Sequence, residues 1–265
     1  MLSLFLLAAL TAPDLDHVFQ RLYSFDFEES RRLAARYVAA NSADPMGHAA
    51  RAAVLLFGEL NRLDALASSL GGEKLRGKPL SPDKAVKKEF DAAVARARQE
   101  ADRRLAQNPE DRDALLAMAI SHGLQRDYLA LIDKKLRQSM DSIREAQNFS
   151  TRLLAVDPTA YDACLNTGFS EYLLGSFPAV LRWVVRIDGV EGDKRKGLRL
   201  LEQAASRGRY MKPFAQLLLA QFYKQEGRPR DSIRVLRELL RDHPDNDTIR
   251  READRLAQAV ESGGL

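Results

Sequence analysis

The chain has 265 residues, of which 45% are hydrophobic and 29% are charged, and its single cysteine, Cys164, excludes an internal disulfide framework or a thiolate zinc site. Lys and Arg number 41 against 37 Asp and Glu, an excess too small to require a nucleic-acid partner. The apolar content excludes collagen-like, mucin-like and wholly disordered chains, and the abundance of Ala, Leu, Arg and Glu favours helix.

The first ten residues form an uncharged apolar run that Thr11, Ala12 and Pro13 follow. A run of about ten residues is too short to span a bilayer, but it has the length of the hydrophobic region of a signal peptide. We therefore expect residues 1–12 to be a signal peptide, cleaved after Thr11 or further on, and the protein to be periplasmic or secreted. The alternative is an apolar first helix in a cytoplasmic protein.

Helical periodicity runs through the rest of the chain. Apolar residues recur at three- and four-residue spacing, as at Leu33, Tyr37 and Ala40, and almost no stretch alternates with period two. The best β-branched run, at residues 184–187, is too short to build a sheet. The sequence therefore predicts an all-α fold.

The clearest structural unit covers residues 214–244, FAQLLLAQFYKQEGRPRDSIRVLRELLRDHP. Gly227 stands where a first helix ends and can adopt positive φ. Leu236 and Leu239 share one face of a second helix, and Pro244 bars its continuation. This unit resembles a tetratricopeptide repeat, a 34-residue pattern with small residues at fixed places in both helices and a proline after the second.

The frame of the second helix recurs along the chain. Residues four, three and five places apart read Leu33, Tyr37, Ala40, Pro45; Ala97, Ala101, Arg104, Pro109; Ala146, Ser150, Leu153, Pro158; and, without the proline, Gly197, Leu201, Ala204, Arg209. The prolines do not recur at multiples of 34 residues, so inserts are expected, at about 71–82 and 176–191.

The resemblance implies one tetratricopeptide-like helical domain over residues 13–260. We predict a superhelix of about four to five helix pairs, closed by a charged helix after Pro244 and followed by a disordered tail at 261–265, because a solenoid must cover the apolar surface at its ends.

Residues 168–208 carry a second resemblance. An apolar stretch with a proline is followed by an aromatic and basic stretch, a Gly-Asp turn and a leucine-rich helix. This order is similar to the middle of the Iml-type eukaryotic tetratricopeptide group, and the matching residues are Gly168, Pro178, Leu181, Gly189, Gly192, Asp193, Gly197, Leu200 and Leu201. The chain also resembles the helical T component of some bacterial TRAP transporters, which is periplasmic and tetratricopeptide-like.

Residues that could do chemistry are few. The chain has no nucleophile elbow, H-E-x-x-H, Walker-type or dinucleotide-binding motif. Cys164 falls at a packed position of the repeat frame, where a thiol behaves as a small hydrophobe. His122 precedes Gly123 at an expected helix end, where the helix dipole suits it. We expect no enzymatic activity, no cofactor and no metal.

The function that we expect is a non-enzymatic scaffold or adaptor that holds a protein or peptide partner in the concave groove of the stacked pairs. The repeat frame predicts that certain side chains of the first helices point into that groove. These candidate partner-binding residues are Asn166, Ser170, Gln216, Tyr223 and Lys224.

Trp183 is a further candidate, an aromatic anchor in the basic stretch of residues 182–209. The apolar and basic helix around Trp183 could instead touch an anionic membrane surface weakly or fill the concave side of the solenoid. The basic stretch itself is expected to be a solvated face, and the alternative is a groove for an acidic peptide or a C-terminal carboxylate. The alternative function is a periplasmic solute- or lipid-binding accessory whose inserts close an apolar cavity lined by Trp183 and Phe177. The identity of the partner and the oligomeric state stay open.

Overall fold

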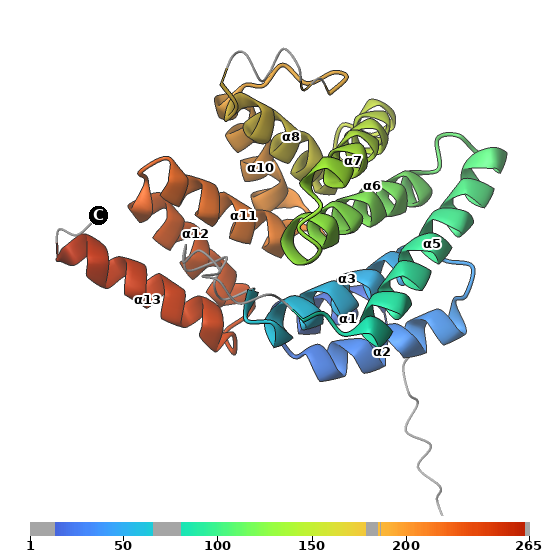
Figure 1. The fold of residues 1–265 in the computed structure, drawn as a ribbon, viewed down its shortest axis with the longest axis horizontal. Helices are drawn as coiled ribbons and strands as arrows, with labels where there is room; N and C mark the ends of the chain where they lie inside the picture. Colours follow the sequence, from blue (N-terminus) through green and yellow to red (C-terminus); the bar gives the residue numbers. More distant parts are fainter. Residues whose placement is uncertain (1–13, 66–80, 179–184, 186, 263–265) are drawn as a thin grey trace, which may run out of the picture.

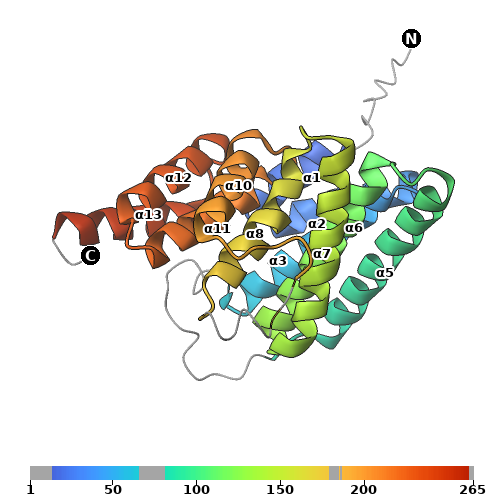
Figure 2. The same ribbon diagram turned by 90° about the horizontal axis from the view of Figure 1, so that it is seen from above.

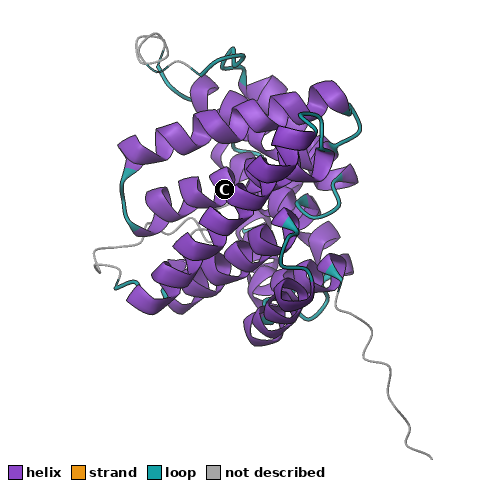
Figure 3. Cartoon of the chain, turned by 90° about the vertical axis from the view of Figure 1, so that its right-hand side faces the viewer, coloured by secondary structure: helices purple, strands orange, loops and turns teal. Residues whose placement is uncertain are grey.

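The computed structural model describes residues 14–65, 81–178, 185 and 187–262, and within these ranges the chain forms eleven α-helices and no strand (Figure 3). The expected signal peptide, Trp183 and residues 263–265 lie outside the described residues. The α-helices are α1 (Leu15–Tyr23), α2 (Phe27–Ala40), α3 (Pro45–Arg62), α5 (Lys84–Gln107), α6 (Arg112–Asp127), α7 (Leu136–Val156), α8 (Cys164–Gly175), α10 (Lys194–Arg207), α11 (Lys212–Gln225), α12 (Pro229–Asp242) and α13 (Asp247–Glu261) (Figure 1). The all-α prediction is confirmed.

Successive helices pack in pairs, α1 with α2, α3 with α5, α6 with α7, α8 with α10 and α11 with α12, and α13 packs on α12. The fold is thus a tetratricopeptide-like superhelix with the predicted number of pairs and the predicted closing helix. Two turns join consecutive helices, a π-helical turn (Tyr128–Ile132) after α6 and a 3-10 turn (Tyr161–Ala163) before α8.

The second helix of each pair ends in the same way. Its capping residue donates its backbone N–H to the carbonyl four residues earlier, and the five capping residues are Asn41, Asn108, Asp157, Gly208 and His243. These caps confirm four copies of the frame, whereas the first copy begins at Ser30, three residues earlier than the sequence predicts. The buried small residues of α2 are Ser30 and Ala34, while Ala40 is exposed and Pro45 begins α3.

Glycines allow α8 and α10 to approach closely. A Cβ atom on Gly197 would lie 2.6 Å from the backbone nitrogen of Tyr172 and 2.8 Å from the carbonyl oxygen of Gly168. Because both neighbours are backbone atoms, a larger residue would force the helices apart. Small residues in the repeat frame therefore set the distance between the helices, as the sequence predicts.

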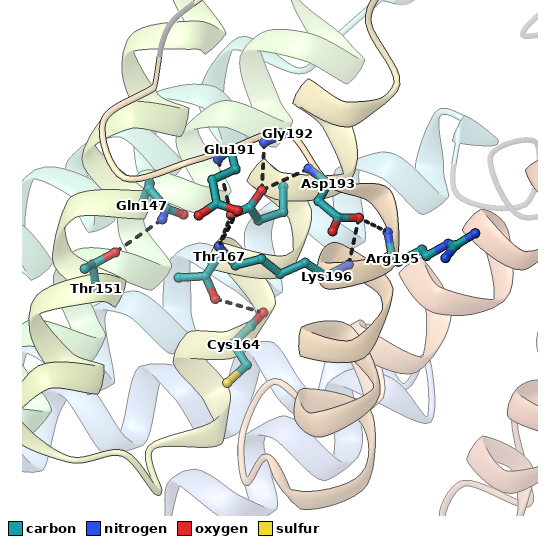
Figure 4. A network of polar contacts seen from close by, with 10 residues as sticks. Gln147, Thr151, Cys164, Thr167, Glu191, Gly192, Asp193, Arg195 and Lys196 are labelled. Atoms are coloured by element: carbon teal, nitrogen blue, oxygen red, sulfur yellow. Dashed lines mark hydrogen bonds and ion pairs between the residues drawn. The ribbon is translucent and has the colours of Figure 1, made fainter.

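Two buried carboxylates of the α8 segment hold the chain at both ends of α10. Glu171 accepts hydrogen bonds from the backbone N–H groups of Gly192 (2.8 Å) and Asp193 (3.1 Å) and pairs with Lys196 at 2.7 Å; the labelled part of this network is shown in Figure 4. Asp162, in the 3-10 turn, accepts from three successive backbone N–H groups after α10, those of residues 209–211. The positive φ of Gly192, 77°, forms the turn that this cluster needs.

The predicted end of a helix near His122 is wrong. Helix α6 continues through Gly123 to Asp127, because Gly123 packs against another helix instead of ending its own. A Cβ atom there would lie 3.1 Å from Oδ1 of Asn166. The ring of His122 stacks on Phe149, and burial, aided by the charge of Arg98, lowers the pKa of His122 to about 3.

The two ends of the array meet. Nδ2 of Asn246 donates to the carbonyl of Tyr23 at 2.8 Å, and Ser24 Oγ lies 3.2 Å from Nδ1 of His243. The rings of Phe57 in α3 and Phe214 in α11 contact edge to face with centroids 5.3 Å apart.

One buried apolar cluster consequently extends from α1 to α13. In both Figure 1 and Figure 2, α13 and α5 lie at opposite ends of the molecule with α1 and α3 between them. The expectation of an open concave groove fails here, because the end of α1 and Phe57 of α3 contact the C-terminal helices directly.

Candidate functional site

Four of the predicted groove residues are buried. The side chains of Asn166, Ser170, Gln216 and Tyr223 are only 1–3% exposed. Their predicted orientation toward an open groove does not hold, because neighbouring helices cover these side chains. A role in partner binding stays a prediction for these residues.

Asn166 belongs to an interior polar cluster. Its Nδ2 donates to the carbonyl of Ala119 and to Ser150 Oγ, both at 3.2 Å, and its Oδ1 accepts from Arg126 at 3.3 Å. Arg126 is itself 3% exposed, pairs with Asp127 at 2.8 Å and lies over the ring of Phe169. Each polar atom is matched, as buried polar groups must be.

The space beside this cluster measures about 10 Å³. It is bordered by Tyr23, Phe57 and Phe214 as well as by Asn166 and Arg126. Such a void holds one water molecule at most, so it does not support the alternative of a solute- or lipid-binding cavity.

Tyr223 and Lys224, two candidate partner-binding residues of α11, form contacts with other helices. Lys224 Nζ lies 2.9 Å from a carboxylate oxygen of Glu252 in α13, and both side chains are largely buried. The hydroxyl of Tyr223 donates to Glu202 in α10. These contacts join α11 to α13 and to α10, so both residues have a structural role.

A larger cleft opens at one edge of the array, where second helices end and first helices begin. It measures about 520 Å³ and lies among the end of α5, the start of α6, the end of α7, the 3-10 turn and the end of α10. Because solenoid partners are held on surfaces to which several repeats contribute, this cleft is the candidate site.

One wall of the cleft carries three carboxylates beside one arginine, Arg112, which is paired with Asp157. Asp111 caps α6 by accepting from the backbone N–H of Ala114, and Arg104 holds it at 2.9 Å. Glu110 and the exposed Asp113 lie beside it at the same helix start. Helix N-termini favour carboxylates, so this wall has a local structural cause.

The facing wall is basic and aromatic. Arg207 is exposed, donates to the hydroxyl of Tyr161 at 3.0 Å and lies 5.3 Å from the centroid of that ring. No carboxylate of the described residues lies within ion-pair distance of its guanidinium. The neighbouring Arg209 is paired to Asp16 at 2.7 Å and lies over the ring of Tyr210, whose pKa burial raises to about 12. The cleft therefore presents one guanidinium, that of Arg207, that has no carboxylate partner among the described residues and lies over the ring of Tyr161.

Part of this wall was visible in the sequence. Arg207 and Arg209 belong to the basic stretch for which the sequence offers a groove for an acidic peptide, whereas Tyr161 and Tyr210 have no such signal. In the sequence, Asp111 and Asp113 follow Pro109 and carry only the signal of a helix start. Nothing local indicates that these segments, about 95 residues apart in the chain, face each other.

The fold defines the chain as an all-helical repeat protein, a class that typically binds other proteins. The family model of the tetratricopeptide repeat matches residues 213–259, which cover α11, α12 and α13. The suspected resemblance is confirmed for this stretch, while the resemblance of residues 168–208 to the Iml-type group stays a prediction. Among curated proteins, none matches the chain.

Two further findings concern the described residues alone. None of their helices is long and apolar enough to cross a membrane. None of their His, Cys, Asp and Glu side chains form a group of three or more that could hold a metal ion. The Cys164 thiol is 2% exposed, and burial raises its pKa to about 11, so it packs as the sequence predicts.

Proposed function

We propose that the protein is a non-enzymatic scaffold that holds a segment of a protein partner at the cleft between the start of α6 and the end of α10. The observation that carries the proposal is Arg207, an exposed arginine on the cleft wall with an aromatic ring beneath it and no carboxylate partner among the described residues. Arginine and tyrosine dominate binding energy at protein interfaces.

The chemistry of the cleft suits a peptide segment that carries both charges. An acidic side chain would meet Arg207, and a basic side chain would meet the wall formed by Glu110 and Asp113. The rings of Tyr161 and Tyr210 supply contact area at a small cost in conformational entropy. A volume of about 520 Å³ accommodates a few side chains rather than a whole domain.

The test is capture from the native host with three tagged baits, followed by quantitative mass spectrometry. The baits are the unaltered chain, Arg207→Glu and, as a matched control, Arg137→Glu, which reverses an exposed arginine on α7 without an ion pair in the described structure. We expect a partner whose yield falls about tenfold with Arg207→Glu, the effect of a 1.4 kcal/mol loss, and is unchanged with the control. Equal yields from all three baits would remove the cleft from the interface.

Export remains part of the proposal. It rests on the apolar run at residues 1–10. Amino-terminal sequencing of the protein recovered from each cell fraction tests it, since a periplasmic or secreted chain that begins after residue 11 is expected. An intact amino terminus in the cytoplasmic fraction would contradict export.

A further inference from the structure

Helix α12 separates its apolar and charged residues completely. Its core-facing side chains, Ile233, Val235, Leu236 and Leu239, are at most 8% exposed. On the opposite side the four arginines Arg230, Arg234, Arg237 and Arg241 are exposed. Because an α-helix turns by about 100° per residue, these four side chains lie within an arc of about 60° around the helix. No other residue of α12 lies in this arc. Along the helix axis the four residues extend over about 16 Å.

We call these four residues the arginine stripe, and most of its charge is not neutralised. Arg234 has carboxylate oxygens of Asp231 and Glu238 at 3.5 and 3.2 Å. In the described part of the chain the other three arginines have no carboxylate within ion-pair distance. Asp242, which follows the stripe, is paired to Lys212 at 2.6 Å.

The segment of the chain that contains the stripe is itself basic. Residues 194–262 contain 16 Lys and Arg against 10 Asp and Glu, although the whole chain has an excess of only four basic residues. Like charges at positions three and four apart repel one another along a helix. Burial of the opposite face of α12 therefore keeps this repulsive array in place.

We propose that the arginine stripe binds an acidic helical segment of a protein partner. A helix that lies along α12 can present carboxylates with the same spacing of four, three and four residues, one for each arginine. The planar guanidinium binds a carboxylate through two parallel hydrogen bonds, which an amine cannot do. This surface is formed by α12 alone, so the proposal does not depend on the cleft.

A membrane surface fits the stripe less well. Helices that lie on membranes bury an apolar face in the lipid, whereas the apolar face of α12 is buried inside the protein. No apolar residue shares the arc of the arginines, so a bilayer would gain only a screened electrostatic attraction.

The experiment measures binding of a fluorescently labelled helical peptide, with glutamates at the stripe's spacing, to the full chain at low ionic strength. A second peptide of the same composition has its glutamates spread around the helix. The test variant is Arg230→Glu/Arg237→Glu. The matched control, Arg195→Glu/Arg199→Glu, makes the same change of net charge on α10. Arg195 and Arg230 are each the second residue of their helix, so the two variants have the same effect on a helix N-terminus.

We expect the in-register peptide to bind more tightly than the spread peptide. Its affinity should fall about tenfold in the test variant, a loss of 1.4 kcal/mol, and change by less than about twofold in the control. Circular dichroism must show unchanged helix content and melting temperature in both variants.

Three outcomes would overturn the proposal. These are equal binding of the two peptides, an equal loss in both variants, or no peptide binding. Vesicles that contain phosphatidylserine and a duplex DNA are tested in parallel, and binding of either one that depends on the stripe, without binding of the peptide, would likewise reject a protein partner.

Discussion

Replacing Asn246 by alanine should loosen both ends of the array at once. The side chain is 1% exposed and makes two hydrogen bonds. Its Oδ1 accepts from the backbone N–H of Ile249 at 3.1 Å and so caps α13, and its Nδ2 donates to the carbonyl of Tyr23 at 2.8 Å, across 223 residues of chain.

The size of the effect follows from these two bonds. Loss of a helix cap costs about 1 kcal/mol, and leaving the Tyr23 carbonyl buried without its donor costs about 1–3 kcal/mol. The free energy of unfolding of Asn246→Ala should therefore fall by about 2–4 kcal/mol. Asn246→Ser keeps an oxygen that can cap α13, but its side chain is too short to reach Tyr23. This variant should therefore lose only the about 1–3 kcal/mol that comes from the unpaired Tyr23 carbonyl.

Urea unfolding measures the loss of free energy of unfolding in each variant. Hydrogen exchange followed by mass spectrometry shows which helices are destabilised. In Asn246→Ala, exchange should accelerate in both α13 and α1, whereas in Asn246→Ser it should accelerate mainly in α1. If exchange in α1 stays at the wild-type rate in both variants while α13 loosens in the alanine variant, the ends of the array do not meet and the closed arrangement is refuted.

Other changes test separate parts of the structure. Gly197→Ala should lower the free energy of unfolding by about 1–3 kcal/mol, because its Cβ would lie 2.6 Å from a backbone nitrogen of α8; a wild-type melting temperature would contradict that close approach. Glu171→Gln removes the charge that faces Lys196 at 2.7 Å and should cost about 1.5–3 kcal/mol in urea unfolding, whereas Glu191→Gln, at an exposed position, should cost less than about 0.5 kcal/mol. Burial lowers the pKa of His243 in the folded protein, so the unfolded chain binds the proton more readily and stability should fall as the pH drops below about 6.5. His243→Gln should show a smaller loss between about pH 7.5 and 5.5, and an equal loss would show that His243 does not titrate this way.

The helix pairs could be predicted because their causes are local. Gly227 has a φ of 68° and ends α11 as expected, and Asp83 caps α5 where the Ser-Pro-Asp sequence places a helix start. The first copy of the frame was displaced because Leu33 and Ala34 are both buried and adjacent. At such a position the periodicity of apolar residues does not fix the rotation of the helix.

Closure of the array could not be predicted, because it depends on pairs far apart in the chain. Arg209 and Asp16 form an ion pair across 193 residues, and Phe19 packs on Tyr210 with ring centroids 5.0 Å apart. Neither contact has a signal in local spacing. The wrong prediction for Asn166 has the same cause. Its spacing in the sequence is that of a groove residue, but contacts between helices bury its side chain in the interior.

A closed array changes where a partner can bind. In an open solenoid the inner faces of the first helices are accessible, and the side chains there are free to recognise a ligand. In this protein those faces are occupied by α1, α3 and their contacts with the last pairs, so the polar groups on them serve stability. The proposed recognition of a partner would therefore use surfaces that closure leaves exposed, the edge where α5 meets α6 and the outer faces of the second helices. The cleft beside Arg207 lies on that edge and the arginine stripe lies on such an outer face, so one partner could use either surface without opening the array.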